Sequence, residues 1–187
     1  MQPILNHLDN IVRPAVRDYV AAESALDAAH IAKDANAIDA ARKNVMRRAR
    51  IATTELHHLQ DFVLHNSQPG LSFARIEDIR SALRAACVFG RGTVAVGDTD
   101  LLRDTADAFK HHLMTRQNSA VSGAAAIISI SNGYGEMRYG EQKWSGIEQV
   151  TVTCKNGHKY SLLYIIQNSF DAWMKVLSQP ELPMGRY

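Results

Sequence analysis

A cluster of basic residues is the most distinctive chemical feature of this 187-residue sequence. No acid occurs among residues 40–54, and the cluster consists of Arg42, Lys43, Arg47, Arg48 and Arg50. At about 100° per residue, Lys43, Arg47 and Arg50 share one stripe of a helix, and His57 continues down the same side. Such a stripe could neutralise nucleic-acid phosphates in contacts that weaken as salt rises. We favour the alternative, a solvated face that keeps a long helix in water and pairs with acids of neighbouring helices.

Arg50 and His57 lie about two helical turns apart on one face. Their R-x6-H spacing resembles, by spacing alone, that of the Arg/His pair of HEPN ribonucleases, which are also helical. The resemblance implies that this pair acts on RNA. The residue after the arginine departs from the family pattern, because Ile51 stands where a polar residue is usual. We therefore assign no catalytic residue.

A metal site is the third chemical possibility. Glu55 and His58 form an ExxH element, which di-iron carboxylate bundles use together with a second ExxH and further carboxylates. A later helix offers Asp107 and His111, which share a face with Asp104. That face is opposite the apolar stripe of the same helix, so we expect it to point to water. We expect surface i,i+4 contacts rather than a ligand cage, and we infer no cofactor.

Several common chemistries are excluded by their missing motifs. The glycine-rich stretch 132–140 is followed by Glu141-Gln142 instead of the Lys-Ser/Thr of a phosphate-binding loop. Cys87 and Cys154 lie far apart and form no zinc-ribbon spacing. Cys87 falls on an apolar helical stripe and is expected to be an inert core thiol, whereas Cys154 is the more reactive candidate.

The elements that must position these residues change in character near residue 119. Up to residue 118 the chain is rich in alanine, and its apolar spacing predicts four amphipathic helices over about 4–29, 38–63, 76–87 and 102–113. Asp34 and Ser72 are the expected caps of the second and third helices, and Gly90 is the expected stop of the third. Pro14 should kink the first helix or mark its true start.

The second part of the chain is rich in glycine and aromatic residues. Residues 127–131 predict a strand that ends at the turn 132–133, and residues 150–162 predict a hairpin around Asn156-Gly157. A final helical stripe includes Phe170 and Trp173, with Asn168 or Ser169 as its cap. We therefore predict an α+β fold, mainly α: an antiparallel bundle of about four helices (1–118), then a small antiparallel sheet and a C-terminal helix (119–187), sharing one core.

Charge and composition narrow the function. The formal charge of +2 gives no bulk electrostatic case for nucleic-acid or membrane binding. Neither a signal peptide nor a stretch long enough to cross a bilayer is present, so a cytoplasmic protein is expected. We predict a non-catalytic interaction protein that associates with itself or with another protein through long amphipathic helices. The alternatives are a nucleic-acid-binding protein using the basic stripe and a helical-bundle metal-binding protein.

Overall fold

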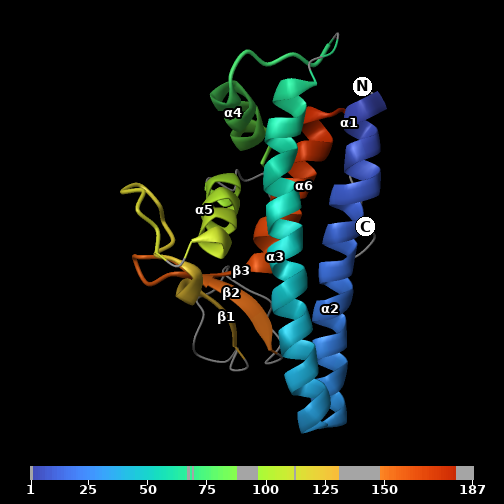
Figure 1. Ribbon diagram of the computed structural model, residues 1–187, viewed down its shortest axis with the longest axis vertical. Coiled ribbons are helices and arrows are strands. Elements are labelled where there is room, and N and C mark those ends of the chain that lie inside the picture. The colour runs from blue at the N-terminus through green and yellow to red at the C-terminus, as the bar shows by residue number, and fades with distance from the viewer. Residues whose placement is uncertain are drawn as a thin grey trace.

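A long antiparallel helical hairpin is the framework of the protein (Figure 1). The computed structural model describes residues 2–66, 68, 70–87, 97–111, 113–130 and 148–179. One arm of the hairpin runs through three helical segments, and the other is a single helix of 31 residues. The segments are α1 (Gln2–His7), the π-helical η1 (Leu8–Val12), α2 (Arg13–Ala32) and the long α3 (Ala35–His65).

Local chemistry fixes the turn between the two arms. α2 begins at Arg13 with Pro14 in its first turn, directly after the π-helical η1, so the chain is helical on both sides of this proline. Of the two predictions for Pro14, a kink or a true helix start, the second is not confirmed, because Val12 before α2 is itself helical. Lys33 takes the left-handed conformation, with φ of 56°, and ends α2. Asp34 then caps α3 as predicted, because its Oδ1 accepts the backbone N–H groups of Asn36 at 3.0 Å and Ala37 at 3.1 Å.

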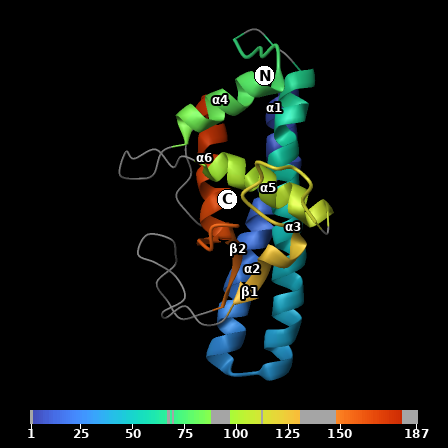
Figure 2. The ribbon, with the colours of Figure 1, turned by 90° about the vertical axis from the view of Figure 1, so that its left-hand side faces the viewer.

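Three further helices and the sheet cover one side of the hairpin, and the turn between α2 and α3 extends past them (Figure 2). The helices are α4 (Ile76–Ala86), α5 (Asp98–Lys110) and α6 (Leu162–Val176). The prediction that Ser72 caps α4 is wrong. The cap is Arg75, three residues after Ser72. Its backbone N–H donates to Asp78 Oδ2 at 3.1 Å, and this hydrogen bond fixes the start of α4. The predicted stop at Gly90 lies outside the described residues.

The described strands form a three-stranded antiparallel sheet in the order β1-β2-β3. They are β1 (Ile127–Ile130), β2 (Gln149–Thr153) and β3 (Lys159–Ser161), preceded by a short 3-10 turn, η2 (Ala124–Ala126). Val152 pairs with Ile127 on one side and with Tyr160 on the other. The predicted hairpin is confirmed, and Gly157 in its turn has a φ of +82°, which favours glycine. The predicted turn at 132–133 lies outside the described residues.

The start of the last helix was predicted too late. α6 begins at Leu162 with Ser161 as its cap, not at Asn168 or Ser169. Residues 162–166 form a short apolar run, and such a run does not distinguish a strand from a buried helix. α6 is packed on most sides, so its polar residues Gln167 and Ser169 are buried as well. An amphipathic pattern of exposed polar and buried apolar residues is therefore weak in this part of the sequence.

One hydrophobic cluster joins the two parts of the chain. It includes Tyr19 and Leu56 of the hairpin together with Val150, Phe170 and Trp173 from the second part. The predicted α+β class, mainly α, with a small antiparallel sheet and a C-terminal helix, is confirmed. The division into segments 1–118 and 119–187 stays a prediction. No helix in the described part of the chain is both long and apolar enough to span a bilayer.

Candidate functional site

The basic stripe of α3 lies at the surface, but much of its charge is already paired. Arg42, Lys43, Arg47 and Arg50 are exposed. Lys43 pairs with Asp39 at 2.7 Å, and Arg48 pairs with Asp18 at 2.7 Å. Arg47 donates to the neutral Asn44 Oδ1 at 3.1 Å. Neither Arg47 nor Arg50 forms an ion pair with an acid among the residues that the structure describes, so the unneutralised part of the stripe is this pair of arginines.

Arg42 is tied to a buried carboxylate that the sequence did not reveal. Glu148, with a side chain only 1% exposed, accepts Arg42 Nε at 2.6 and 2.8 Å, Ser129 Oγ at 2.7 Å and His30 Nε2 at 2.6 Å. Burial alone raises the pKa of this carboxyl, but the hydrogen bonds from Arg42, Ser129 and His30 outweigh it and hold the pKa below its ordinary value. Glu148 thereby joins α2, α3 and the sheet.

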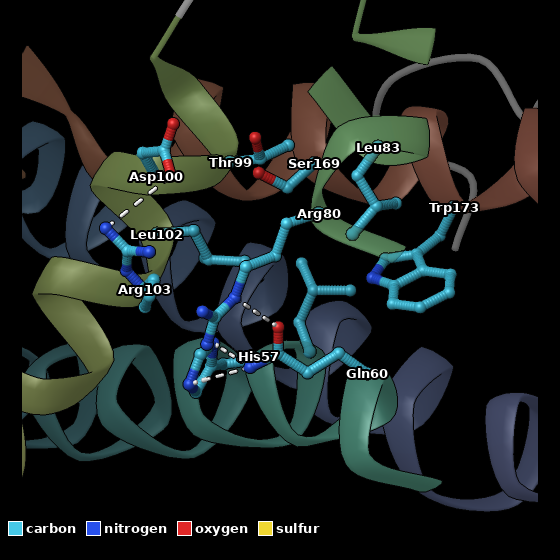
Figure 3. A pocket seen from close by; sticks show the side chains of 11 residues that line it. His57, Gln60, Arg80, Leu83, Thr99, Asp100, Leu102, Arg103, Ser169 and Trp173 are labelled. Carbon is cyan, nitrogen blue, oxygen red and sulfur yellow. Dashed lines mark hydrogen bonds and ion pairs between the residues drawn. The ribbon is translucent and has the colours of Figure 1, made fainter. Parts of the chain in front are cut away.

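His57 lines a small cavity formed by α3, α4, α5 and α6 (Figure 3). The cavity volume is about 20 Å³, which is of the order of one water molecule. Arg50 is not among the residues around it. The lining residues are Leu56, His57, Gln60, Arg80, Leu83, Thr99, Asp100, Leu102, Arg103, Ser169 and Trp173.

The cavity keeps His57 neutral. Gln60 Nε2 lies 3.2 Å from Nδ1 and 3.1 Å from Nε2 of the imidazole. Burial lowers the pKa of His57 to about 3, and the positive charges of Lys110, His58, Arg80 and Arg103 add to that shift. A histidine with so low a pKa is a neutral imidazole near neutral pH.

Two of the four proposed metal ligands have other partners. His58 Nε2 lies 2.8 Å from Lys110 Nζ, and Asp107 pairs with Arg116 at 3.3 Å. His111 follows the end of α5 and is exposed, and Glu55 is half-buried on α3. Over the part of the chain that the structure describes, no three His, Cys, Asp or Glu side chains are grouped as a metal ion requires. Metal binding by Glu55, His58, Asp107 and His111 stays a prediction without a converging ligand set.

The expectation that Asp104 points to water is wrong. Its side chain is 3% exposed, it pairs with Arg116 and with Arg103 at 3.5 Å, and its Oδ2 accepts the backbone N–H of Ala120 at 2.6 Å. The segment 116–120 therefore folds over this face of α5. The apolar spacing of α5 gave no sign of this cover, because the covering residues are themselves polar or small.

Both cysteines are buried. Cys87 Sγ lies 3.8 Å from the carbonyl oxygen of Asn168, and burial, with Asp98 nearby, raises the pKa of the thiol to about 12. This matches the predicted inert core thiol. Cys154 is only 8% exposed, so the greater reactivity predicted for it has no support from its access to solvent.

A second and wider hollow lies between the start of α5 and the β2–β3 turn. Its volume is about 540 Å³, which suits a small molecule. Its lining mixes charges of both signs, and the carboxylates already have partners: Asp100 binds Arg84 at 2.7 and 2.8 Å, and Asp98 binds Asn168 at 2.6 Å. This balance indicates no particular class of ligand.

The side of α2 that faces away from α3 carries an exposed apolar surface. We call it the α2 outer face, and its members are Ala21, Ser24, Ala25, Ala28, Ile31 and Ala32, all exposed. Ile31 is 75% exposed, the highest value among the large exposed hydrophobic residues that the structure describes. The opposite side of α2 holds the buried residues Tyr19, Ala22 and Leu26. In Figure 1, α2 forms one edge of the molecule.

Comparison of the chain with protein-family models, curated proteins and solved structures gives no match.

Proposed function

We propose that this protein is a non-catalytic interaction protein that pairs with a second copy of itself through the α2 outer face. The observation that carries the proposal is the exposure of Ile31 on a stripe of alanines spaced four, three and four residues apart. That spacing is the one by which helices pack along a common seam, and small side chains let two helix backbones approach closely. A solvated helix has no need of an exposed isoleucine beside such a stripe.

The charges at the two ends of α2 favour a second, antiparallel copy as the occupant. Arg17 and Asp18 lie at one end, and Lys33 and Asp34 lie at the other. An antiparallel pair places the 17–18 end of one copy beside the 33–34 end of the other. Arg17 then approaches Asp34, whose Oδ1 also caps α3, and Lys33 approaches Asp18, which also pairs with Arg48, so opposite charges approach at both ends.

The size of the face sets the expected strength of the pair. Residues 17–32 span ~24 Å of helix, so the contact is close to the ~1,000 Å² that a specific interface needs. Alanine side chains also bury little apolar area. We therefore expect a dimer with a dissociation constant in the micromolar range rather than an obligate dimer.

The test is sedimentation velocity over a concentration series, comparing the wild-type protein with Ile31→Glu. Ile31→Glu replaces the most exposed large apolar side chain of the α2 outer face with a charge that dimerisation must desolvate, so it should weaken dimerisation about 10-fold. Glutamate is a good helix former, so α2 should keep its structure. The matched control is Leu113→Glu, which places the same charge at an isoleucine-sized residue that is 71% exposed and outside α2.

Dimers in the wild type and in Leu113→Glu, with monomers in Ile31→Glu, support the proposal. A wild-type protein that stays monomeric up to a few hundred micromolar contradicts it. Equal dimerisation of the two variants contradicts the assignment of the contact to α2.

Arg47 and Arg50 favour a second candidate function, the binding of a polyanion such as RNA. Their guanidinium groups are exposed and make no ion pair with an acid in the described ranges. Two arginines predict weak binding that falls steeply with salt. Fluorescence anisotropy with a labelled RNA should show that Arg50→Glu abolishes binding at low salt and that Arg75→Glu, at an exposed arginine of α4's cap, does not. No binding by the wild type at low salt would rule this function out.

A further inference from the structure

The small cavity beside His57 contains polar groups without partners. Ser169 is 1% exposed, and its hydroxyl oxygen makes no hydrogen bond. Arg103 Nε is also buried without a hydrogen bond, although this guanidinium forms two long ion pairs, with Asp104 Oδ1 3.5 Å from Nε and Asp100 Oδ1 3.6 Å from Nη2. A buried donor left unpaired costs free energy, so native structures usually satisfy such groups with protein, water or an ion.

The groups around the cavity are mainly hydrogen-bond donors (Figure 3). Arg103 Nε can only donate, and the hydroxyls of Thr99 and Ser169 can each donate one hydrogen. Gln60 turns its amide nitrogen toward His57 and its Oε1 toward Arg80 Nε at 3.3 Å, so its oxygen is already used. An occupant that accepts several hydrogen bonds and gives none fits this arrangement.

The lining of the cavity carries one net positive charge, because its charged residues are Arg80, Arg103 and Asp100. Asp100 binds Arg84 at 2.7 and 2.8 Å and also lies 3.6 Å from Arg103 Nη2. Glu77 binds Arg80 at 2.5 Å and lies at the exposed end of that pair. The cations Lys110, Arg80 and Arg103 all disfavour a proton on His57 and lower its pKa, so the electrostatic potential that they create at this point is positive.

We propose that this cavity is a binding site for a small monovalent anion of the size of chloride, held by Arg103 and Ser169 between α3, α4, α5 and α6. The volume of about 20 Å³ accepts a single atom of that size and excludes phosphate, sulfate or a carboxylate. A bound anion joins the four helices through their polar side chains. The site therefore links the stability of the four-helix contact to the halide concentration.

The first test is the thermal unfolding midpoint at constant ionic strength, with sodium chloride replacing sodium gluconate. We expect a rise of about 5 °C once chloride exceeds its dissociation constant ~100-fold, and the rise should continue with the logarithm of the chloride concentration. Ser169→Ala keeps a good helix former in α6 and should weaken the apparent chloride affinity about tenfold. Arg103→Gln should abolish the response. The control Arg48→Gln removes a half-exposed arginine of α3 that is far from the lining and should leave the response unchanged.

The second test needs no variant, so it stands even if Arg103→Gln fails to fold. Crystals grown or soaked in sodium bromide are measured at the bromine absorption edge. The expected result is an anomalous peak in the cavity between Arg103 and Ser169. A water molecule there with no bromine signal overturns the proposal. A chloride response of equal size in the wild type, Ser169→Ala and Arg103→Gln overturns it as well.

Discussion

At the scale of single residues, Glu148 shows how a buried charge can be stabilised by partners far away in the sequence. Its carboxylate precedes β2, while Arg42 and His30 lie 106 and 118 residues earlier. Three donors from three elements converge on it, which offsets the penalty of taking a carboxylate out of water. Glu148 thereby fixes the distance between the sheet and the hairpin.

The first prediction concerns this carboxylate and pH. Its pKa is lower in the folded protein than in the unfolded chain, so its contribution to stability is complete above the unfolded pKa, about 4.3. It is lost as the pH falls through the lower folded pKa. Glu148→Gln should therefore reduce the free energy of unfolding by about 2 kcal/mol at pH 7, and the difference from the wild type should shrink below about pH 4.

Urea unfolding at several pH values measures this difference. The control is Asp39→Asn, because Asp39 is exposed and, among the residues that the structure describes, its ion pair is with the exposed Lys43, a contact worth less than ~0.5 kcal/mol. A loss of similar size in both variants, or a Glu148→Gln difference that does not change with pH, would refute the role given to the buried carboxylate.

The sequence predicted the surface position of the basic stripe, since it follows from helical spacing. It could not predict that Glu148 neutralises Arg42, because the pairing depends on how the sheet packs against α3. The same limit applies to Asp104. Its face was expected to be exposed, and only the tertiary fold brings Arg116 and the segment 116–120 over it.

At the scale of elements, the caps determine where helices begin. Asp34 gave a clear signal, because an aspartate before a long apolar stripe is typical of a helix start. The start of α4 was misplaced because Ser72 has the same local preference as a true cap, and the Asp78 carboxylate that decides the start lies inside the helix. For α6, the strand-like residues 162–166 concealed the first turn.

The second prediction concerns the cap of α3. Asp34→Ala removes the acceptor for two backbone N–H groups and should lower the free energy of unfolding by about 1 kcal/mol. Urea unfolding of dilute protein, in which dimers do not contribute, measures the loss. Asp39→Ala is the control, because it removes an exposed acid one turn further along α3 that caps nothing. If the two variants lose the same amount, the cap does not hold the hairpin turn.

At the scale of the whole molecule, the shared core ties the second part of the chain to the hairpin. Trp173 and Phe170 of α6 and Val150 of β2 belong to the same hydrophobic cluster as Leu56 of α3. The sequence suggested this only indirectly, through the lack of a linker between the two parts. The arrangement of α4, α5 and α6 on one side of the hairpin was beyond sequence reasoning, because the same stripes fit several packings.

The third prediction follows from that core. The chain should unfold in one cooperative transition, because removing α6 from the hairpin exposes the core of both parts. Far-UV circular dichroism and the fluorescence of Trp173, in a Trp144→Phe background, should give coincident urea midpoints. Two separate transitions would show that residues 1–118 and 119–187 are independent domains.

The same packing leaves the α2 outer face uncovered, and the central claim is that a second copy covers it in an antiparallel orientation. Sedimentation equilibrium of a charge-swap pair tests this most directly. Lys33→Glu places a negative charge beside the partner's Asp18 and should weaken the dimer about threefold to tenfold, because like charges then meet at both ends of the contact.

The double variant Asp18→Lys with Lys33→Glu is the decisive sample, and the single variant Asp18→Lys is measured beside it because this change also removes the pair with Arg48. Because the double variant restores opposite charges at both ends of the antiparallel contact, its dimer should have a dissociation constant close to that of the wild type. The antiparallel contact is contradicted if the loss of dimerisation free energy in the double variant equals the sum of the losses in the two single variants. It is also contradicted if the wild-type protein does not dimerise.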